Sequence, residues 1–356
     1  MAEIKFEKTA QLKEKPDVSK IAFGTHFTDY MFEMDYNPEK GWHDPKIVPY
    51  RDIAVSPANT TLHYGQAIFE GMKAFRQDND VVVFRALDHL NRLNNSARLL
   101  DIPQVDVETV HQGLRQLISL EKAWVPAKQG QSLYIRPFIF ATDPFLGVSV
   151  SETYKLLIIL SPVAAYYANG FAPVKIMVED TYVRAVRGGL GEAKTPANYA
   201  ASLHAGLVAH QKGYDQTLWL DGVERKYIEE VGSMNILFKI KGEIVTPALD
   251  GSILSGITRR TVLAVAKEWG VPVSERLISI DEIKEAYDNG DLEEVFGSGT
   301  AAVISPVGVL GYKGKDMVIN DGKIGAFSQK MFDHITGLQS GSVKDTQGFI
   351  EVVAQV

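Results

Sequence analysis

The sequence predicts two domains of mixed α/β (α+β) class, for three reasons. The chain has 356 residues, and one domain commonly takes ~100–200 residues. Both halves contain strand-like and helix-like stretches, without the regular alternation typical of a doubly wound parallel sheet. Between them, Gly170 and Pro173 make residues 164–173 the best linker candidate. We therefore expect a smaller N-terminal domain over 1–163 and a larger C-terminal domain over 174–356.

In the first half, a polar stretch rich in turn formers over residues 1–55 is expected to cover a surface. Leucines at helical spacing predict a helix over 87–100, and a more polar helix is expected near 106–122. Runs of branched and aromatic residues predict three strands, at 81–85, 132–141 and 154–163.

The second half again mixes the two kinds of element. Helices are predicted over 198–212, with Leu203, Leu207 and Val208 on one face, and over 255–270, where Gly270 ends the helix. Strand-like runs lie at 174–180, 216–222 and 227–240, and the segment 293–312 is predicted to form a strand, a glycine-rich turn and a second strand. Lys241 and Gly242 predict a turn.

Composition argues against several classes of function. The net charge is −7, which argues against nucleic acid as a partner. The chain has no cysteine, which excludes disulfides and thiolate metal sites, and its eight histidines show no metal-binding spacing. The N-terminus lacks the apolar core of a signal peptide, and no stretch approaches the ~20 apolar residues of a membrane span. We therefore expect a cytoplasmic protein with no metal site and no membrane partner.

One glycine-rich segment contains a candidate nucleophile. In RGGLGEAKTPANY (187–199), three glycines precede Lys194, and Tyr199 follows five residues later. A lysine held in a tight turn and shielded from water has a lowered pKa and can attack a carbonyl carbon. On this segment alone, an ordinary surface lysine is the alternative.

Two segments are candidates for binding an anion. SGITRR (255–260) places Ile257 and Thr258 at a helix start, where free N–H groups and the helix dipole favour a phosphate. FGSGTAA (296–302) is a small-residue turn whose backbone amides and Thr300 hydroxyl could hold phosphate or carboxylate oxygens. The alternatives are a plain N-cap by Ser255 and an ordinary tight hairpin.

Three charged positions need an explanation. Residues 229 and 230 of YIEEVGSMN (227–235) point to opposite faces of a strand. One carboxylate should therefore be solvated, and the other should face inward. A protonated ring nitrogen would be a suitable partner for the inward carboxylate. Arg136 lies inside an apolar strand and is expected to pair with an anion or an acid. Arg92 lies opposite the leucine stripe of its helix, which on pattern alone indicates a solvated face.

Together, these segments resemble the branched-chain aminotransferases of pyridoxal-phosphate (PLP) fold type IV. The resemblance runs in order from about Thr60 to Val307, and FEGMKAF and EVGSMN are its most specific parts. Its markers are YGQAIFEGMKAFR (64–76), HLNRL (89–93), YIRP (134–137), GVS (147–149), GGLGEAKTPANY (188–199), EVGSMN (230–235), LSGITR (254–259) and GSGTA (297–301).

The resemblance implies a role for each matched residue. Lys194 matches the lysine that carries the cofactor and moves the substrate proton. Tyr199 matches the residue on the phenolic oxygen of PLP, Glu230 the carboxylate on its ring nitrogen, and Ser233 a small hydroxyl beside the ring. The remaining matches are the phosphate ligands Arg92, Ile257, Thr258 and Thr300, and the substrate-pocket residues Tyr64, Phe69, Tyr134, Arg136 and Ala301. The match at Arg92 reverses the solvated interpretation from pattern alone.

The family also implies an activity and an assembly. It suggests ping-pong transamination of leucine, isoleucine or valine with 2-oxoglutarate, which gives branched 2-oxo acids and glutamate, by a homodimer whose active site lies between a smaller N-terminal and a larger PLP-binding domain. D-amino-acid aminotransferases, aminodeoxychorismate lyases and a PLP-binding protein without activity are the alternatives.

Two departures from the family pattern stand out. Pro196-Ala197 replace a usual glycine pair, and Ala302 and Ser305 stand where animal members carry a CxxC, so no thiol switch can operate here.

Overall fold

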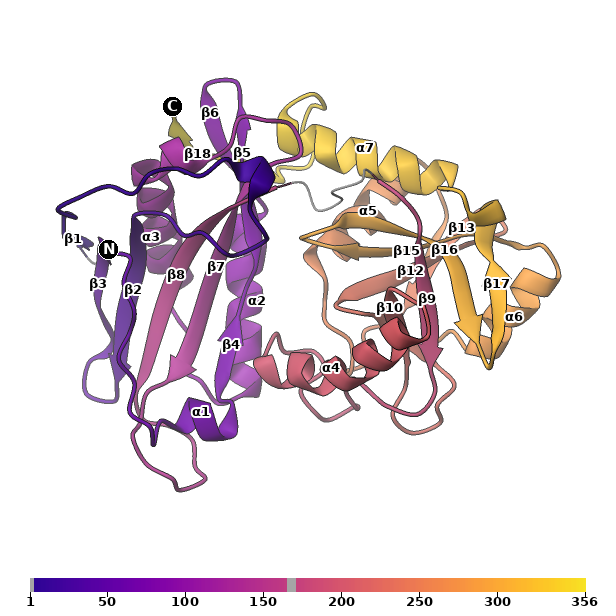
Figure 1. Cartoon of the computed structure of the whole chain (residues 1–356), viewed down its shortest axis with the longest axis horizontal. Helices are drawn as coiled ribbons and strands as arrows, with labels where there is room; N and C mark the ends of the chain where they lie inside the picture. The colour runs from indigo at the N-terminus through magenta and orange to yellow at the C-terminus, as the bar shows by residue number, and fades with distance from the viewer. Residues whose placement is uncertain (1–2, 165–170) are drawn as a thin grey trace. The chain divides into compact units, whose positions relative to one another are not determined.

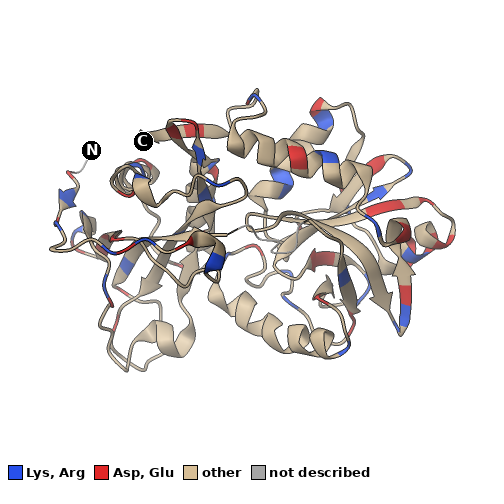
Figure 2. Ribbon diagram, turned by 45° about the horizontal axis from the view of Figure 1, so that its top comes forward, with Lys and Arg blue, Asp and Glu red and all other residues tan. Residues whose placement is uncertain are grey.

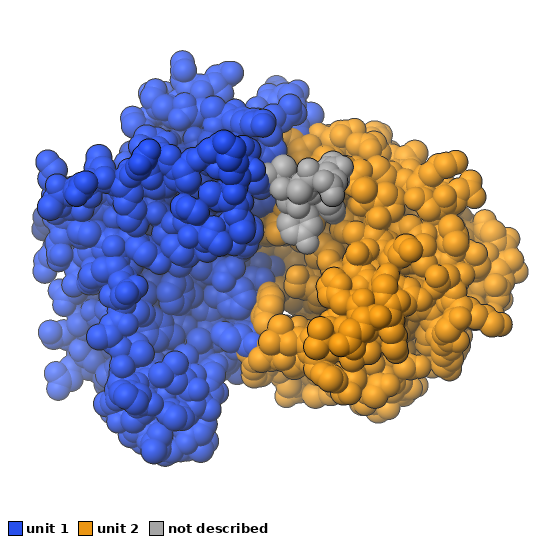
Figure 3. All heavy atoms as spheres, in the orientation of Figure 1, with its two compact units in different colours: residues 1–166, 193–196, 337–356 blue, residues 167–192, 197–336 orange. Residues whose placement is uncertain are grey.

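The structure, a computed structural model, describes residues 3–164 and 171–356. The chain forms two compact units (Figure 3), of which unit 1 comprises Met1–Tyr166, Ala193–Pro196 and Gly337–Val356, and unit 2 comprises Tyr167–Glu192 and Ala197–Thr336. This division differs from the expected domain over 174–356, because two of its segments belong to unit 1. The C-terminal segment does so because its strand pairs with the strand at 80–84. Of the expected linker, residues 165–170 lie outside the described part of the chain.

Unit 1 is built on a nine-stranded sheet in the order β1-β3-β2-β8-β7-β5-β6-β18, with β4 paired to β7 (Figure 1). The strands are β1 (Lys5–Phe6), β2 (Tyr30–Asn37), β3 (Gly41–Pro49), β4 (Ala67–Phe69), β5 (Met72–Gln77), β6 (Asp80–Phe84), β7 (Ser132–Ala141), β8 (Tyr154–Val163) and β18 (Ile350–Gln355). The predicted strands at 81–85, 132–141 and 154–163 are confirmed as β6, β7 and β8. The expectation that residues 1–55 only cover a surface is wrong, because β2 and β3 enter the sheet and Met31 and Phe32 are buried.

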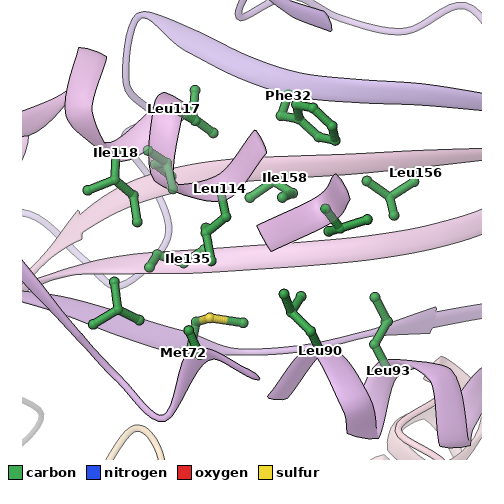
Figure 4. Close-up of a cluster of buried hydrophobic side chains, with 14 of the residues drawn as sticks. Phe32, Met72, Leu90, Leu93, Leu114, Leu117, Ile118, Ile135, Leu156 and Ile158 are labelled. Carbon is green, nitrogen blue, oxygen red and sulfur yellow. The ribbon is translucent and has the colours of Figure 1, made fainter. Parts of the chain in front are cut away.

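Three α-helices accompany this sheet: α1 (Thr60–Tyr64), α2 (Ala86–Leu99) and α3 (Val107–Leu120), and short 3-10 helices lie at Val18–Lys20 and Lys122–Trp124. The helices predicted at 87–100 and 106–122 are confirmed as α2 and α3. Their apolar faces pack on the sheet, where Leu90 and Leu114 meet side chains of β2, β7 and β8 in one buried cluster (Figure 4). Burial of this apolar surface is the main stabilising contribution to unit 1.

Unit 2 contains a second nine-stranded sheet, in the order β11-β10-β9-β16-β15-β12-β13-β14, with β17 paired to β16. Because β11 also pairs with β12, the strands β9, β10, β11, β12, β15 and β16 close on themselves as a barrel. The strands are β9 (Val174–Glu179), β10 (Gln216–Leu220), β11 (Ile228–Val231), β12 (Met234–Ile240), β13 (Glu243–Pro247), β14 (Val273–Arg276), β15 (Leu292–Gly299), β16 (Val303–Tyr312) and β17 (Lys315–Val318). A strand in a closed barrel turns one face to the interior, so its other face is buried only where another segment covers it.

The helices of unit 2 are α4 (Pro196–Gln211), α5 (Ile257–Glu268), α6 (Ile280–Asp288) and the part of α7 (Ala326–Ser340) up to residue 336, with a 3-10 helix at Ile319–Gly322. The predicted run over 227–240 is two strands, because Gly232 adopts a positive φ of 54° and turns the chain between β11 and β12. The turn at Lys241 and Gly242 is confirmed, with positive φ at both residues. Leu203 and Leu207 of α4 are 72% and 56% exposed, so their face does not line the core of the unit.

Acidic and basic residues lie interspersed along both units (Figure 2). This arrangement agrees with the modest net charge of the sequence. Within residues 3–164 and 171–356, no helix has the length and apolar character needed to cross a bilayer.

Candidate active site

The backbone of Lys194 is fixed within unit 1. Its N–H donates to Ser96 Oγ of α2 (2.9 Å), and its carbonyl accepts from the N–H of Phe69, the last residue of β4 (3.0 Å). The hydroxyl of the buried Thr195 donates to Ala67 O, 2.8 Å away. The lysine is therefore held between a strand end and a helix, which does not fit an ordinary surface loop. Its Nζ lies 5.0 Å from the centre of the Phe69 ring.

Arg92 is buried, and the solvated interpretation of its helix face is therefore wrong. Its Nε donates to Glu70 Oε1 (2.7 Å) and its Nη2 to Glu70 Oε2 (2.9 Å), while His89 Nδ1 lies 2.8 Å from the same Oε2. Glu70 is fully buried, so the carboxylate that keeps Arg92 inside unit 1 comes from the segment between β4 and β5. The leucine spacing of α2 carries no information about this partner, which lies 22 residues away along the chain.

Three of the predicted substrate residues lie together. Arg136 Nη2 donates to Tyr134 Oη (3.0 Å), and its guanidinium stands 4.6 Å from the ring centre of Phe69 and 5.3 Å from that of Tyr134. A Cβ on Gly71 would meet Tyr134 Oη at 2.0 Å, so only glycine leaves room for this phenol. The contacts of Arg136 are thus with two aromatic rings and a hydroxyl, and they differ from the acid or anion that the sequence led us to expect. Tyr64, at the end of α1, is instead 44% exposed and donates to Leu146 O.

In unit 2, Glu230 is buried on β11. Its Oε1 accepts from Leu254 N (2.6 Å) and lies 3.3 Å from Nη2 of the buried Arg184. Arg184 also donates to Gly191 O and Ser252 O, at 3.0 and 2.5 Å. The loop that precedes Lys194 and the loop that precedes α5 are therefore tied to the same arginine, and this arginine stabilises the charged form of Glu230.

The prediction that one of the paired acids is solvated is wrong, because Glu229 is buried as well. Ser252 Oγ donates to Glu229 Oε1 (2.5 Å), and burial raises the pKa of Glu229 to about 7. A strand in an open sheet would expose one of two successive side chains. Here residues 252–254 contact both acids, because Ser252 Oγ donates to Glu229 and Leu254 N donates to Glu230.

The two predicted anion-binding segments are joined by Asn235. This residue pairs with Ser298 across β12 and β15, and its Nδ2 donates to Leu254 O just before α5 (2.9 Å). The N-cap of α5 is Gly256 rather than Ser255, without a capping side-chain hydrogen bond, and a Cβ at Gly256 would meet Asn235 Oδ1 at 1.9 Å. The first turn of α5, with Ile257 and Thr258, thus presents backbone N–H groups that no side chain of the N-cap covers.

The remaining predicted residues are placed less tightly. Thr300 and Ala301 form the turn between β15 and β16, as expected, and Ser298 Oγ beside them has no hydrogen-bond partner among the described residues. Tyr199 lies in the first turn of α4 and is half-buried, one residue after Asn198, whose Nδ2 donates to Leu190 O (2.8 Å). Ser233 is exposed in the turn between β11 and β12.

Sequence reasoning missed Glu70, His89, Ser96 and Arg184. Glu70 and His89 stand inside two quoted motifs, FEGMKAF and HLNRL, which is the one signal that could have marked them. Arg184 and Ser96 have no comparable signal, because the fold brings their partners near, and most of these partners are backbone atoms.

Comparisons with known proteins show the family to which the chain is similar. The family model described as Amino-transferase class IV matches residues 67–309. Branched-chain-amino-acid aminotransferase 2 of Bacillus subtilis is 56% identical over 99% of this chain and 97% of its own length. The crystal structure of the Escherichia coli branched-chain amino acid aminotransferase aligns with a TM-score of 0.74 at 29% identity, over 91% of this chain and 99% of that one.

A second solved structure contains a ligand. The T.th. branched-chain amino acid aminotransferase, complexed with N-(5'-phosphopyridoxyl)-L-glutamate, aligns with a TM-score of 0.73 at 25% identity, over 90% of this chain and 98% of that one. The fold type IV assignment made from the sequence is confirmed. With a family match over most of the chain and a relative of 56% identity along nearly its full length, the chain belongs to the class IV aminotransferases, among their branched-chain-amino-acid members.

Proposed function

We propose that the chain transfers an amino group between branched-chain L-amino acids and 2-oxoglutarate, with PLP as cofactor. The observation that carries this proposal is the fixed backbone of Lys194, bonded to Ser96 and Phe69, in a chain 56% identical to a branched-chain-amino-acid aminotransferase. The phosphopyridoxyl-glutamate bound by the T.th. relative supports both the cofactor and glutamate as a substrate.

The residues of the chain fit the phosphate of this cofactor at two places. The start of α5 lacks a side-chain cap, and Gly256 has no room for a Cβ, so backbone amides near Ile257 and Thr258 suit a phosphate. Ser298 Oγ, without a partner among the described residues, and the turn at Thr300 add polar groups to the same region. We therefore propose Ile257, Thr258 and Thr300 as phosphate ligands.

Among the proposed phosphate ligands, Arg92 supplies the positive charge. It is the only one of these ligands that belongs to unit 1, and it is already oriented by Glu70. An arginine suits phosphate because its guanidinium presents several N–H groups in one plane.

The cofactor supplies an electron sink for the charge that develops at the substrate α-carbon. Lys194 Nζ is the group that we propose carries the cofactor and then removes and returns the α-proton. The carboxylate of Glu230 keeps the ring nitrogen protonated, and its bond from Leu254 N and the nearby Arg184 favour the ionised form that this role requires. We place Tyr199 at the phenolic oxygen and Ser233 beside the ring.

The cluster of Phe69, Tyr134 and Arg136 offers two kinds of surface to a substrate side chain. The two rings suit the aliphatic chain of leucine, isoleucine or valine, and the guanidinium and phenol suit the γ-carboxylate of glutamate. One pocket can therefore accept both substrates of a ping-pong reaction. Tyr64 and the backbone at Ala301 complete the proposed pocket.

We also propose a homodimer. The loop between β7 and β8 exposes Leu146, Val148 and Val150 at 63%, 83% and 51%, which is a concentration of apolar side chains typical of an interaction surface. Light scattering on the purified protein tests this directly. The cytoplasmic location expected from the sequence stays a prediction.

The function is tested by amino-group transfer from a panel of donors to 2-oxoglutarate, with Lys194→Ala as the inactive variant. Loss of the nucleophile and base should lower turnover by ~10²- to 10⁴-fold or more, with the fold retained. Lys212→Ala, at an exposed lysine just after α4, is the matched control and should keep full activity. Transfer from D-alanine but not from L-leucine would move the chain to another class IV activity, and full activity of Lys194→Ala would remove Lys194 from the mechanism.

A further inference from the structure

We infer that Glu70 is a positioning residue that fixes the guanidinium of Arg92 for phosphate binding, with His89 holding the carboxylate from the other side. The inference rests on the proposed function, because it takes Arg92 as a ligand of the cofactor phosphate. Neither Glu70 nor His89 would touch the cofactor in this role.

Four donors bind the carboxylate of Glu70. Oε1 receives Arg92 Nε, and Oε2 receives Arg92 Nη2, His89 Nδ1 and the N–H of Gly71, at 2.7, 2.9, 2.8 and 3.1 Å. Both oxygens are therefore held, and Oε2 is held from three directions. All three side chains are buried, at 0%, 2% and 8% exposure for Glu70, His89 and Arg92. Such a carboxylate has one orientation, and it imposes that orientation on the arginine.

The protonation states follow from the same contacts. Burial pushes the pKa of Glu70 upward, but the charge of Arg92 and the hydrogen bonds from His89 and Arg92 hold this pKa well below its usual range. Burial lowers the pKa of His89, so its ring is neutral at pH 7. Because an ionised Glu70 can only accept, the neutral His89 carries its proton on Nδ1 and donates it to Glu70 Oε2.

The bidentate contact with Glu70 determines which edge of the Arg92 guanidinium is turned toward an anion. It uses two of the five guanidinium N–H groups, those on Nε and Nη2 that face Glu70. The edge that includes Nη1 points away from the carboxylate, and a phosphate is bound best by such a planar pair of donors. Without Glu70, the flexible arginine side chain would lose this preference and pay rotamer entropy on binding.

The same face of α2 also fixes Lys194. His89, Arg92 and Ser96 are spaced by three and four residues, which puts them in one row along the helix. Ser96 Oγ accepts a hydrogen bond from Lys194 N (2.9 Å), while His89 and Arg92 donate to Glu70 between β4 and β5. One face of α2 thus orients both the guanidinium of Arg92 and the backbone of Lys194.

A purely structural ion pair is the competing explanation. It predicts that loss of Glu70 destabilises unit 1 and weakens binding of any form of the cofactor to a similar extent. The positioning role predicts a loss that is specific to the phosphate group. The two are separated by the phosphate advantage, which we define as the dissociation constant for pyridoxal divided by that for PLP.

The experiment titrates the full-length apo-protein with PLP and with pyridoxal, and follows binding by absorbance. Glu70→Gln keeps the size of the side chain, but glutamine cannot accept both hydrogen bonds from Arg92. We expect this variant to lower the phosphate advantage by ~10- to 100-fold, as for loss of a hydrogen bond to a charged group. Binding of pyridoxal should change less than twofold. Arg92→Met should remove most of the advantage, and Glu70→Gln should have no further effect on it in the Arg92→Met background.

Each other outcome has a definite meaning. If Arg92→Met lowers the advantage and Glu70→Gln does not, the positioning role is overturned while the proposed role of Arg92 stands. If Arg92→Met leaves it unchanged, Arg92 is not a phosphate ligand and both assignments fail. Equal weakening of PLP and pyridoxal by Glu70→Gln would identify a structural ion pair and overturn the inference.

Variants of His89 provide the test if Glu70→Gln does not fold. Asparagine can place its Nδ2 near the position of His89 Nδ1 and keep the donor to Glu70, whereas phenylalanine cannot. His89→Asn should retain the phosphate advantage within about threefold, and His89→Phe should lower it by ~10-fold. Equal values for the two variants would contradict the role of His89 in holding the carboxylate.

Discussion

Replacing Glu121 by glutamine is expected to change how the stability of the protein depends on pH. Glu121 ends α3 and is 2% exposed. Its Oε1 accepts from Tyr30 N (2.5 Å), and Asp29 lies beside it. Burial raises the pKa of Glu121 from its usual value of 4.5 to about 7. The hydrogen bond from Tyr30 opposes this shift, and the negative charge of Asp29 adds to it. The carbonyl oxygen of glutamine can accept the same bond from Tyr30 without carrying a charge.

The size of the effect follows from proton linkage. Between the unfolded pKa of 4.5 and the folded pKa of about 7, the native state holds a proton that the unfolded state has released. The free energy of unfolding of the wild type therefore falls as pH rises through this window, and the loss is complete above pH 7. At ~1.4 kcal/mol per pKa unit, the loss amounts to about 2 to 3 kcal/mol between pH 5 and pH 8. Glu121→Gln has no such titration.

The assay is urea unfolding of wild type and variant at pH 5, 6, 7 and 8, with the same saturating PLP in every sample. The free energy of unfolding of Glu121→Gln minus that of wild type should rise by about 2 to 3 kcal/mol from pH 5 to pH 8. Glu39→Gln, in the exposed turn between β2 and β3, controls for the loss of one carboxylate. A difference between Glu121→Gln and wild type that stays constant over this range would refute the reasoning.

Two further pairs of substitutions have a steric or packing basis. Leu90→Ala removes a fully buried side chain from α2 and should lower the free energy of unfolding, measured by urea titration, by ~2–5 kcal/mol. Leu87 lies on the same helix but is 46% exposed, so Leu87→Ala should lower it far less. Equal losses would mean that the core of unit 1 is misassigned. Gly191→Ala would place a Cβ 2.2 Å from Ser252 O, and backbone atoms cannot give way cheaply, so the melting temperature and the affinity for PLP should both fall. Gly206→Ala, with open space around the new Cβ on α4, should instead stabilise by up to ~1 kcal/mol, and a loss there equal to that of Gly191→Ala would contradict the steric explanation.

Elements with a strong local pattern could be predicted from the sequence. The strands at 132–141 and 154–163 match β7 and β8 residue for residue, because long runs of branched and aromatic residues have few other conformations. The helices α2 and α5 begin within two residues of the predicted positions. The turn at Lys241 and Gly242 needs positive φ, which glycine supplies.

Features that depend on distant partners could not be predicted. The leucine pattern of α2 says that Arg92 faces away from the apolar stripe, but only the fold brings Glu70 there and makes the position buried. Alternation along β11 predicted one solvated acid, but contacts with residues 252–254, which are remote in sequence, help to bury both Glu229 and Glu230. The strand β18 pairs with β6 across about three quarters of the chain, so no local signal could assign it to unit 1.

The candidate site likewise contains residues that the local sequence could suggest and residues that only the fold brings into place. Its lysine and its proposed helix-start ligands stood in segments whose composition was compatible with the chemistry, namely a glycine-rich approach to Lys194 and small residues before Ile257. The residues that hold these groups in place, Ser96 and Arg184, act on backbone atoms of loops that are remote in sequence. Recognition of the family from ordered motifs supplied the roles, and the structure adds the supporting contacts.

The measurement that tests the central claim most directly is the visible spectrum of the purified protein through two half-reactions. We predict an absorption band of the lysine-linked cofactor that L-leucine removes and 2-oxoglutarate restores, and that Lys194→Ala does not show. A band that persists unchanged with excess L-leucine, L-isoleucine and L-valine would contradict the assignment as a branched-chain aminotransferase.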